Sequence, residues 1–284
     1  DVSTANYSQS FSVSGHQSLP TGVAFSPDGT NMFIVGPDRD YAIKYVLSTG
    51  FDVSTAVFSH EFYVSSQESQ CRGIQFSTDG TKMFILGTIS AGVNEYTLTA
   101  WDISTATFVD TFSVSSQDTD PRGFCFNPDG TKMYMVGQTD DYVSQYSLSA
   151  AFDISTASFN SKTFYIGTQE SEPRGLSFNN DGTKMFLVGD YGNKLFVYSL
   201  STAFDVTTSV YSAYFSLSSQ DTNPSGIAWN SIGTKMFITG VIGQDVNEYD
   251  LGSSVSASGY QPVHTTNSTD TTYWTDINSM TANQ

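Results

Sequence analysis

The sequence predicts an all-β fold, a five-bladed β-propeller of four-stranded antiparallel blades, from a repeat, a composition and the way the chain begins. A block of about fifty residues recurs five times, with turn glycines separated by 51, 50, 52 and 51 residues at Gly29, Gly80, Gly130, Gly182 and Gly233. A fixed period in this range is typical of solenoids and propellers. The 21 Phe and 16 Tyr, set among many Ser, Thr, Val and Gly residues, favour strands and turns.

The third repeat shows how one block supplies four strands. Residues 123–126 form a short apolar run, and Asn-Pro-Asp-Gly-Thr at 127–131 is typical of a tight turn that leads into a second strand over 132–137. Residues 142–148 alternate as a third strand, and residues 157–166 supply a fourth. Four antiparallel strands in this span make one propeller blade.

The innermost strands should be the first of each block. Their middle position is always small or polar, whereas bulky side chains flank it, as at Ala24, Gln75, Cys125, Ser177 and Ala228. We expect the bulky neighbours to fill the wedges between adjacent sheets, because protein interiors are close-packed.

The two ends of the repeat region indicate a closed ring. Residues 1–14 copy the linker and fourth strand of a blade, with no blade before them, whereas the fifth repeat ends at Leu251 without a fourth strand. We therefore expect the N-terminal strand to pair with blade five, which removes exposed sheet edges. The predicted propeller spans 1–251, and 252–284 is a Ser/Thr-rich tail or linker.

Charge and hydropathy exclude two classes of partner. The net charge of −17 comes from 28 acidic and 11 basic residues, so the mean surface potential repels nucleic acid. No segment approaches the ~20 apolar residues of a membrane span, so no membrane insertion is expected. The N-terminus carries neither a signal peptide nor an initiator Met, which favours a mature or excised piece of something longer.

Residues that commonly carry catalysis or bind cofactors are sparse. Cys71 and Cys125 are too few for a disulfide framework and too isolated for a zinc site, so we expect free structural thiols. The histidines His16, His60 and His264 occupy unrelated places in the repeat, and no nucleophile elbow or phosphate loop is present. No catalytic residue, metal or cofactor is predicted.

One face of the ring is the candidate site, the face that carries the loops into each blade and the loops between second and third strands. A glutamine recurs in the first loop set, which predicts a ring of amides near the axis, at Gln17, Gln67, Gln117, Gln169 and Gln220. Three of the four arginines share one repeat position, where Thr21 and Ser225 stand in the other two blades, at Arg72, Arg122 and Arg174.

Each set has two interpretations. The arginines could form a partial guanidinium ring that binds a carboxylate, a sulfate or sugar hydroxyls, or they could pair with nearby loop acids such as Asp120 and Glu172 and tie blade to blade. The glutamines could bind a ligand, or they could satisfy loop backbone groups.

The repeat resembles a known group of propellers. The run Pro-x-Gly-Ile-x-Phe-Ser-x-Asp-Gly-Thr-Lys-Met-Phe-Ile-x-Gly is similar to the repeat of the YVTN and lactonase-like group, and more loosely to NHL and WD repeats, over residues 14–251. These families include enzymes and scaffolds, so the resemblance implies fold more than function. The tail over 273–282 resembles joining segments of virion or tail-associated proteins of marine phages; its alternative is a plain linker.

Near-identical blades favour a non-enzymatic binding or structural module, because repeated weak sites suit recognition of glycans or another cell-surface ligand. Such a module would be part of a larger extracellular or virion-associated protein, with other segments of that protein as partners. A metal-dependent hydrolase of the lactonase type, with acids such as Asp118, Glu170 or Asp221 on the metal, is the alternative, and a pure structural spacer is the third possibility.

Overall fold

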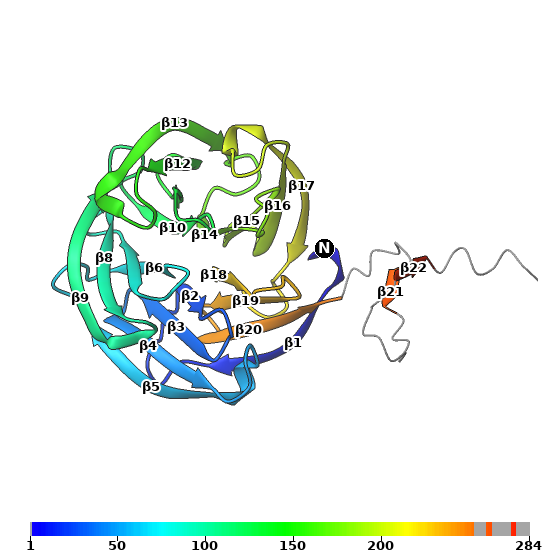
Figure 1. The fold of residues 1–284 in the computed structure, drawn as a ribbon, viewed down its shortest axis with the longest axis horizontal. Coiled ribbons are helices and arrows are strands. Elements are labelled where there is room, and N and C mark those ends of the chain that lie inside the picture. Colours follow the sequence, from blue (N-terminus) through cyan, green and yellow to red (C-terminus); the bar gives the residue numbers. More distant parts are fainter. Residues whose placement is uncertain (1, 253–259, 263–273, 277–284) are drawn as a thin grey trace, which may run out of the picture. The chain divides into compact units, whose positions relative to one another are not determined.

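The structure, a computed structural model, describes residues 2–252, 260–262 and 274–276, and it confirms the five-bladed β-propeller of four-stranded antiparallel sheets (Figure 1). In blades one to four the strands of a sheet follow chain order. These blades comprise β2 Gly22–Phe25, β3 Asn31–Gly36, β4 Arg39–Leu47 and β5 Ala56–Tyr63; β6 Cys71–Phe76, β7 Lys82–Gly87, β8 Gly92–Thr99 and β9 Asp102–Ser113; β10 Pro121–Phe126, β11 Lys132–Gly137, β12 Tyr142–Leu148 and β13 Ala157–Tyr165; β14 Pro173–Phe178, β15 Lys184–Gly189, β16 Lys194–Leu200 and β17 Ser209–Ser216.

Blade five is closed by the N-terminal strand, as predicted. Its sheet has the order β1-β20-β19-β18 and comprises β18 Pro224–Trp229, β19 Lys235–Gly240, β20 Asp245–Leu251 and β1 Ala5–Ser12. Strands β1 and β20 run antiparallel, with Ala5 opposite Leu251 and Ser12 opposite Asp245. Because the first and last strands of the propeller belong to one sheet, chain entry and exit are held together.

Four of the five Asp-Val-Ser-Thr-like linkers form short 3-10 turns before the outer strands, whereas the linker of blade two lies within β9. The turns are η1 Val2–Thr4, η2 Val53–Thr55, η3 Ile154–Thr156 and η4 Val206–Thr208. In η3 the Asp153 side chain caps the turn by accepting the Ser155 N–H at 3.1 Å, and Ile154 is buried beneath it. An acid at this position satisfies an otherwise unpaired donor, which explains why the linker motif recurs.

Aromatic pairs fill the wedges between blades. In each wedge a ring at the end of the innermost strand meets a ring from the second strand of the preceding blade, with centroids 4.4–4.7 Å apart in Phe25–Phe237, Phe76–Phe33, Phe126–Phe84, Phe178–Tyr134 and Trp229–Phe186. Offset and tilted ring pairs of this kind stabilise a core beyond simple area burial. The expected packing of bulky flanking residues is therefore present in all five wedges.

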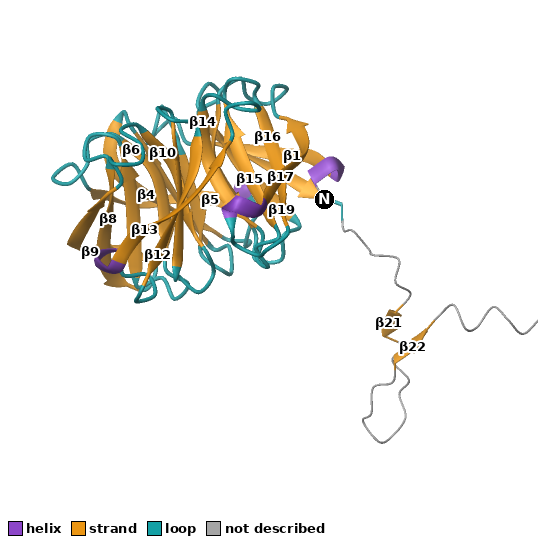
Figure 2. Cartoon of the chain, turned by 90° about the horizontal axis from the view of Figure 1, so that it is seen from above, coloured by secondary structure: helices purple, strands orange, loops and turns teal. Residues whose placement is uncertain are grey.

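Loops gather at the two ends of the ring of strands (Figure 2). At one end the five turn glycines have φ of 69–72°, the left-handed conformation that the Asp-Gly turns require. Residues 1–251 form one compact unit, and 252–284 form a second in which β21 Tyr260–Pro262 pairs with β22 Trp274–Asp276. Within the described part of the chain, no helix has the length and apolar character needed to cross a membrane.

Candidate functional site

The loops of the candidate face are fixed by buried side chains that link its two loop sets. Glu68, on the loop before β6, accepts the N–H of Gln70 at 2.7 Å and also the N–H of Ser90, on the loop between β7 and β8, at 3.1 Å. The equivalent side chains are 0–4% exposed, at Gln17, Glu68, Asp118, Glu170 and Asp221. The expectation that both loop sets share one face is therefore confirmed.

The second strand of each blade ends in a glycine. The buried loop side chain of that blade packs directly against this glycine and leaves no room for a Cβ. A Cβ added at Gly87 would overlap the Glu68 carboxyl, and one added at Gly137 would overlap Asp118. The acids considered as metal ligands for a hydrolase are thus structural: Asp118 accepts three backbone N–H groups, from Asp120, Thr139 and Asp140, at 2.7–3.2 Å.

The predicted ring of five amides near the axis is not present, because Gln17 belongs to a different position. The Gln17 N–H donates to the carbonyl of Val13 four residues earlier, as the Glu68 N–H does to Val64, so Gln17 takes the place of the buried acids. His16 stands where the other blades have glutamine, and it stacks on Phe58 with centroids 3.8 Å apart.

The other four glutamines do not line the cavity on the axis. The Tyr146 hydroxyl donates to Gln117 at 3.1 Å, and the Tyr96 hydroxyl donates to Gln67 at 3.4 Å, in the wedges between blades. Gln169 and Gln220 have the same backbone hydrogen bond to the residue three positions earlier, and none of the five glutamines lines the axial cavity. In the cases of Gln67 and Gln117 the amide satisfies a buried hydroxyl.

The three arginines do come together. Arg72, Arg122 and Arg174 start the innermost strands of three consecutive blades, and all three line a narrow cavity on the axis. Arg122 pairs with Asp120 at 2.5 Å, and Arg174 pairs with Asp190 at 2.6 Å. These acids come from the loops of the same blade as their arginine, so the pairs do not tie blade to blade as considered from the sequence.

Arg72 differs from the other two because it forms no ion pair among the described residues. Its terminal nitrogen donates only to the Gln70 amide oxygen, at 3.3 Å. Burial, together with the charges of Arg122 and Arg174, lowers the pKa of Arg72 to about 10, although Asp120 partly offsets this. The Nε atoms of all three arginines are buried without a hydrogen-bond partner in the part of the chain that is described. The cluster therefore contains N–H donors without an acceptor among the described residues.

Two acids, Glu172 and Asp190, lie beside Arg174 and affect each other's ionisation. A hydrogen bond with Asp190 and the charge of that carboxylate raise the pKa of Glu172, which lies 3.7 Å from Arg174. The opposite side of the axis has no charge at the arginine position. There the Thr21 hydroxyl donates to the carbonyl of Cys71 at 3.2 Å, and the Ser225 hydroxyl donates to the carbonyl of Thr21 at 3.3 Å. The positive charge is thus confined to an arc over blades two, three and four.

The axis is almost closed beneath the arginines. The cavity there has a volume of about 20 Å³, room for little more than one water molecule. It is narrow because the backbones of neighbouring inner strands approach closely: a Cβ at Gly22 would lie 2.9 Å from the Cα of Gly73. A ligand group can therefore reach the guanidinium groups from outside but cannot pass through the ring.

The other end of the axis opens into a wider funnel of about 400 Å³, lined by Gln75, Cys125 and Ser177 among the aromatic rings. Both cysteines are free and buried, as predicted, and burial raises the pKa of each thiol. A protonated, buried thiol is a poor nucleophile, so neither cysteine is suited to covalent chemistry.

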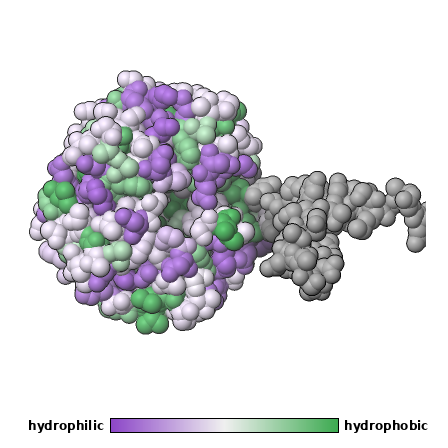
Figure 3. Space-filling model, in the orientation of Figure 1, coloured by the Kyte–Doolittle hydropathy of each residue, from purple (hydrophilic) through white to green (hydrophobic). Residues whose placement is uncertain are grey.

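Exposed apolar side chains lie on the loops of the candidate face in three blades, and sequence reasoning missed them. Ile89, Tyr191 and Ile242 stand at one position of the loops between second and third strands and are 65%, 73% and 67% exposed. Figure 3 shows hydrophobic residues scattered among hydrophilic ones over one face of the ring. Large apolar residues in turns that usually hold polar ones were the available signal.

Acidic and histidine side chains near these residues have partners of their own. In the described ranges, no group of three His, Cys, Asp or Glu side chains is placed to hold a metal ion. In the loop before β10, Arg122 pairs with Asp120, and the Asp118 carboxylate accepts backbone N–H groups. His264 lies outside the described residues, and His16 is stacked on Phe58.

Comparison with known proteins supports the fold. No protein-family model and no curated protein matches the chain. Among solved structures, a protein of Bacteroides uniformis assigned provisionally as a 6-phosphogluconolactonase is 12% identical, with a TM-score of 0.50 over 83% of this chain and 68% of that one. A functionally unknown protein of Desulfotomaculum acetoxidans is 12% identical, with a TM-score of 0.49 over 78% of this chain and 62% of its own.

The periplasmic gluconolactonase of Pseudomonas aeruginosa is 15% identical, with a TM-score of 0.47 over 78% of this chain and 62% of its own. The chain thus spans 62–68% of the lengths of these three structures. The likeness to the Bacteroides uniformis structure agrees with the resemblance of the repeat at the level of fold. The phage resemblance of the tail, over residues 273–282, is not tested by these comparisons, and within that range the structure describes only residues 274–276.

Proposed function

We propose that the protein is a non-enzymatic binding module that recognises a single carboxylate or sulfate group, as on an acidic glycan, at the arginine arc. The observation that carries the proposal is the gathering of Arg72, Arg122 and Arg174 at one mouth of the axis, with Arg72 lacking an acidic partner among the described residues. Guanidinium groups bind carboxylate and sulfate oxygens through paired N–H donors, which suits this role.

The total charge supports a ligand that carries one anionic group and not a polyanion. Against a net charge of −17, an extended polyanion is repelled by most of the surface. A single anionic group at the axis reaches three guanidinium groups while the rest of its molecule stays neutral. The narrowness of the cavity, about 20 Å³, means that such a group binds at the mouth without entering the ring.

The apolar side chains beside the arc support a ligand with ring-shaped apolar faces. Tyr191 is 73% exposed and follows Asp190, the partner of Arg174. A tyrosine ring offers a large face with a polar edge, which suits contact with a sugar. A surface glycan as ligand fits an extracellular or virion-associated setting within a larger protein, and we include that setting in the proposal.

The hydrolase alternative receives less support from the geometry. The carboxylates of Asp118 and Asp221 accept backbone N–H groups with both oxygens, and Glu170 does so with one. Metal binding would require these acids to give up bonds that hold the loops. We therefore treat metal-dependent turnover of lactones or esters as an outcome of the test.

The test compares two variants that change the total charge equally. Arg72→Gln removes a guanidinium from the arc, and Lys132→Gln removes a charge that follows the turn at the other end of the ring. A panel of oligosaccharides with one carboxylate or sulfate, and their neutral counterparts, is titrated calorimetrically. Loss of one charged hydrogen bond, about 1.5–3 kcal/mol, corresponds to a dissociation constant at least about tenfold weaker.

We expect this weakening in Arg72→Gln and a change below twofold in Lys132→Gln. Equal weakening in both variants would show that total charge governs binding and would contradict a localised site. No binding to any acidic oligosaccharide would refute ligand recognition and favour the spacer, whereas metal-dependent turnover would favour the hydrolase.

A further inference from the structure

The funnel at the end of the axis opposite the arginine arc has aromatic walls. The ring that ends each innermost strand is half-buried and lines the funnel, at Phe25, Phe76, Phe126, Phe178 and Trp229. Each of these rings packs against a buried ring of the preceding blade, and the part that stays exposed faces the funnel. The axis therefore ends in a ring of five aromatic side chains.

Four of these rings are supported by a second aromatic residue, from the linker before the outer strand. The two ring centroids are 5.3–5.8 Å apart in the pairs Phe25–Phe51, Phe76–Trp101, Phe126–Phe152 and Phe178–Phe204. The linker residue has a left-handed backbone, with φ of 55–61°, and its N–H donates to the carbonyl of a turn glycine at 3.0–3.1 Å. Because the framework holds both rings, the walls are formed before any ligand binds, as in most small-molecule sites.

The deeper part of the funnel is uncharged and has one free amide. It is lined by the middle residues of the innermost strands, Ala24, Gln75, Cys125, Ser177 and Ala228. The Ser177 hydroxyl oxygen accepts the indole N–H of Trp229 at 2.9 Å. The side-chain amide of Gln75 is half-buried and has no hydrogen-bond partner among the described residues. Alanine at this position in blades one and five shows that a blade packs without a polar side chain here.

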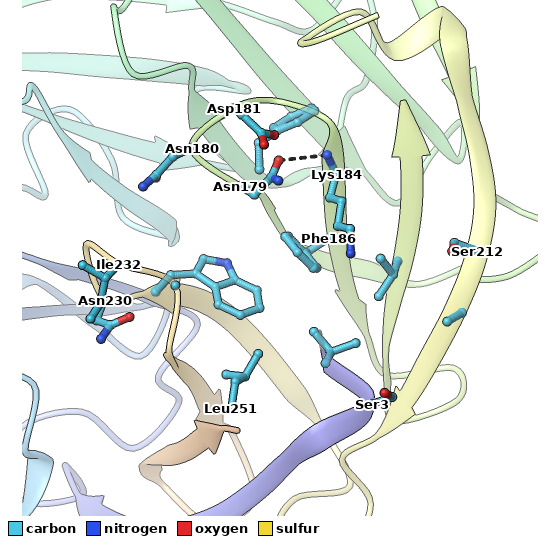
Figure 4. Close-up of a pocket in the computed structure, with 16 residues that line it drawn as sticks. Ser3, Asn179, Asn180, Asp181, Lys184, Phe186, Ser212, Asn230, Ile232 and Leu251 are labelled. Carbon is cyan, nitrogen blue, oxygen red and sulfur yellow. Dashed lines mark hydrogen bonds between the residues drawn. The ribbon is translucent and has the colours of Figure 1, made fainter. Parts of the chain in front are cut away.

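The two asparagines at the rim of the funnel are already bonded to the turns. The Asn180 side chain donates to the carbonyl of Ser231, on the next blade, at 3.0 Å. The Asn230 side chain accepts two backbone N–H groups of its own turn at 2.8 and 3.0 Å. Figure 4 shows Asn180 and Asn230 on the turns of adjacent blades. The amide that remains available to a ligand inside the funnel is that of Gln75.

We propose that the funnel is a binding site for a small uncharged molecule with an aromatic ring and one amide-like group. The ring would pack among the aromatic walls, and the polar group would exchange hydrogen bonds with the Gln75 amide. The volume of about 400 Å³ is suited to a small molecule. Aromatic rings pack well against one another in tilted and offset arrangements, which the walls offer from several sides.

Charge and hydrogen-bonding capacity select this class of ligand over two others. Within the described ranges, no Asp, Glu, Lys or Arg side chain lines the funnel, so an ion would lose its hydration without a compensating charge. A sugar brings several hydroxyls, and one free amide cannot satisfy them all, which leaves polar groups buried without partners. A ring with a single polar group avoids both costs.

Fluorine NMR titrations of the full chain with three uncharged probes test the proposal. 4-Fluorobenzamide has the ring and the amide, fluorobenzene has only the ring, and 2-fluoroacetamide has only the amide. We expect 4-fluorobenzamide to bind with a dissociation constant on the order of 1 mM. Loss of the hydrogen bond should make fluorobenzene about two- to tenfold weaker, and loss of the ring should make 2-fluoroacetamide more than about tenfold weaker.

Two variants with the same substitution locate the bound probe. Gln75→Leu removes the amide from the funnel, and Gln138→Leu makes the same change on the loop between β11 and β12, at the other end of the ring. Gln75→Leu should weaken 4-fluorobenzamide about two- to tenfold, to the affinity of fluorobenzene, whereas Gln138→Leu should change it by less than about twofold. Melting temperatures show that both variants fold, and the comparison of probes on the unsubstituted protein does not depend on them.

Absence of 4-fluorobenzamide binding would overturn the proposal, as would an equal affinity for either simpler probe. Unchanged binding in Gln75→Leu, or equal weakening in both variants, would also contradict it. A concentration-dependent dimer that excludes the probe would show that a second copy fills the funnel and would refute a small-molecule site. The probes carry no charge, so none of these results depends on anion binding at the arginine arc.

Discussion

Replacing Glu170 with glutamine should stabilise the propeller, although Glu170 is completely buried and hydrogen-bonded. One carboxylate oxygen accepts the N–H groups of Glu172 and Tyr191 at 2.8 and 3.2 Å, whereas the other is buried without a partner in the described structure. A glutamine keeps the accepting oxygen and replaces the unpaired charged one by a neutral amide. Blade one already has Gln17 at this position, so the loop tolerates the amide.

The expected gain follows from the cost of burying a charge. A buried neutral polar group is cheaper than a buried charge, and we expect Glu170→Gln to raise the free energy of unfolding at pH 7 by on the order of 1 kcal/mol. For a domain of this size, 1 kcal/mol corresponds to a rise in melting temperature of roughly 2–4 °C.

The gain should depend on pH. Burial raises the pKa of Glu170 above its ordinary value of 4.5, so between 4.5 and the raised value the folded protein binds a proton that the unfolded chain has released. The stability of the unsubstituted protein therefore falls as pH rises through this window and is recovered as pH is lowered. Urea unfolding of both proteins from pH 4 to 8 should show the advantage of Glu170→Gln at neutral pH and its disappearance in acid.

Glu68→Gln is the matched control because both Glu68 oxygens are satisfied. Besides the Gln70 N–H, they accept the N–H and the hydroxyl of Ser90 at 3.1 and 2.8 Å. An amide nitrogen would face these donors, and we expect a loss of about 1–3 kcal/mol. If Glu170→Gln destabilises the protein as much as Glu68→Gln, the unpaired oxygen has a partner in solution and the reasoning is refuted.

Three further predictions concern the framework. Phe152→Ala should cost about 3–5 kcal/mol in urea unfolding because it empties a filled wedge, while Val57→Ala, 67% exposed, should change stability by less than about 0.5 kcal/mol. Deletion of residues 1–14 removes β1 from blade five and should lower the melting temperature; an unchanged value would contradict closure by β1. Cys71 and Cys125, buried with raised thiol pKa, should react with a thiol reagent only in denaturant, and rapid labelling of the native protein would contradict their burial.

The fold could be predicted because every blade repeats the same local signals. The Asp-Gly turns place glycine at the left-handed position, and the half-repeat over residues 1–14 identifies the strand that closes blade five. Such signals are local in sequence or repeated at a fixed distance, so no knowledge of side-chain contacts is needed.

The site was only partly predictable. The glutamines of the five loops were aligned by residue type alone, without regard to how many residues separate each glutamine from the preceding strand. Gln17 resembles the glutamines of the other loops, but it lies four residues after Val13, as Glu68 lies four residues after Val64. Counting from the strand would have placed His16 in the glutamine position. The loop contacts of Glu68 span some twenty residues and are not visible in a local pattern.

The asymmetry of the axis argues that recognition, where it occurs, is confined to one side of the ring. The hydroxyls of Thr21 and Ser225 donate to backbone carbonyls of neighbouring inner strands. In blades one and five, the side chain at this position is therefore bonded within the ring. Arginine at the same position is too long for that bond and keeps buried Nε atoms without partners in the described structure. A framework role alone is met by a small hydroxyl residue, as two blades show. Three adjacent guanidinium groups raise the electrostatic cost of folding, and the anionic ligand that we propose would offset that cost by binding between them.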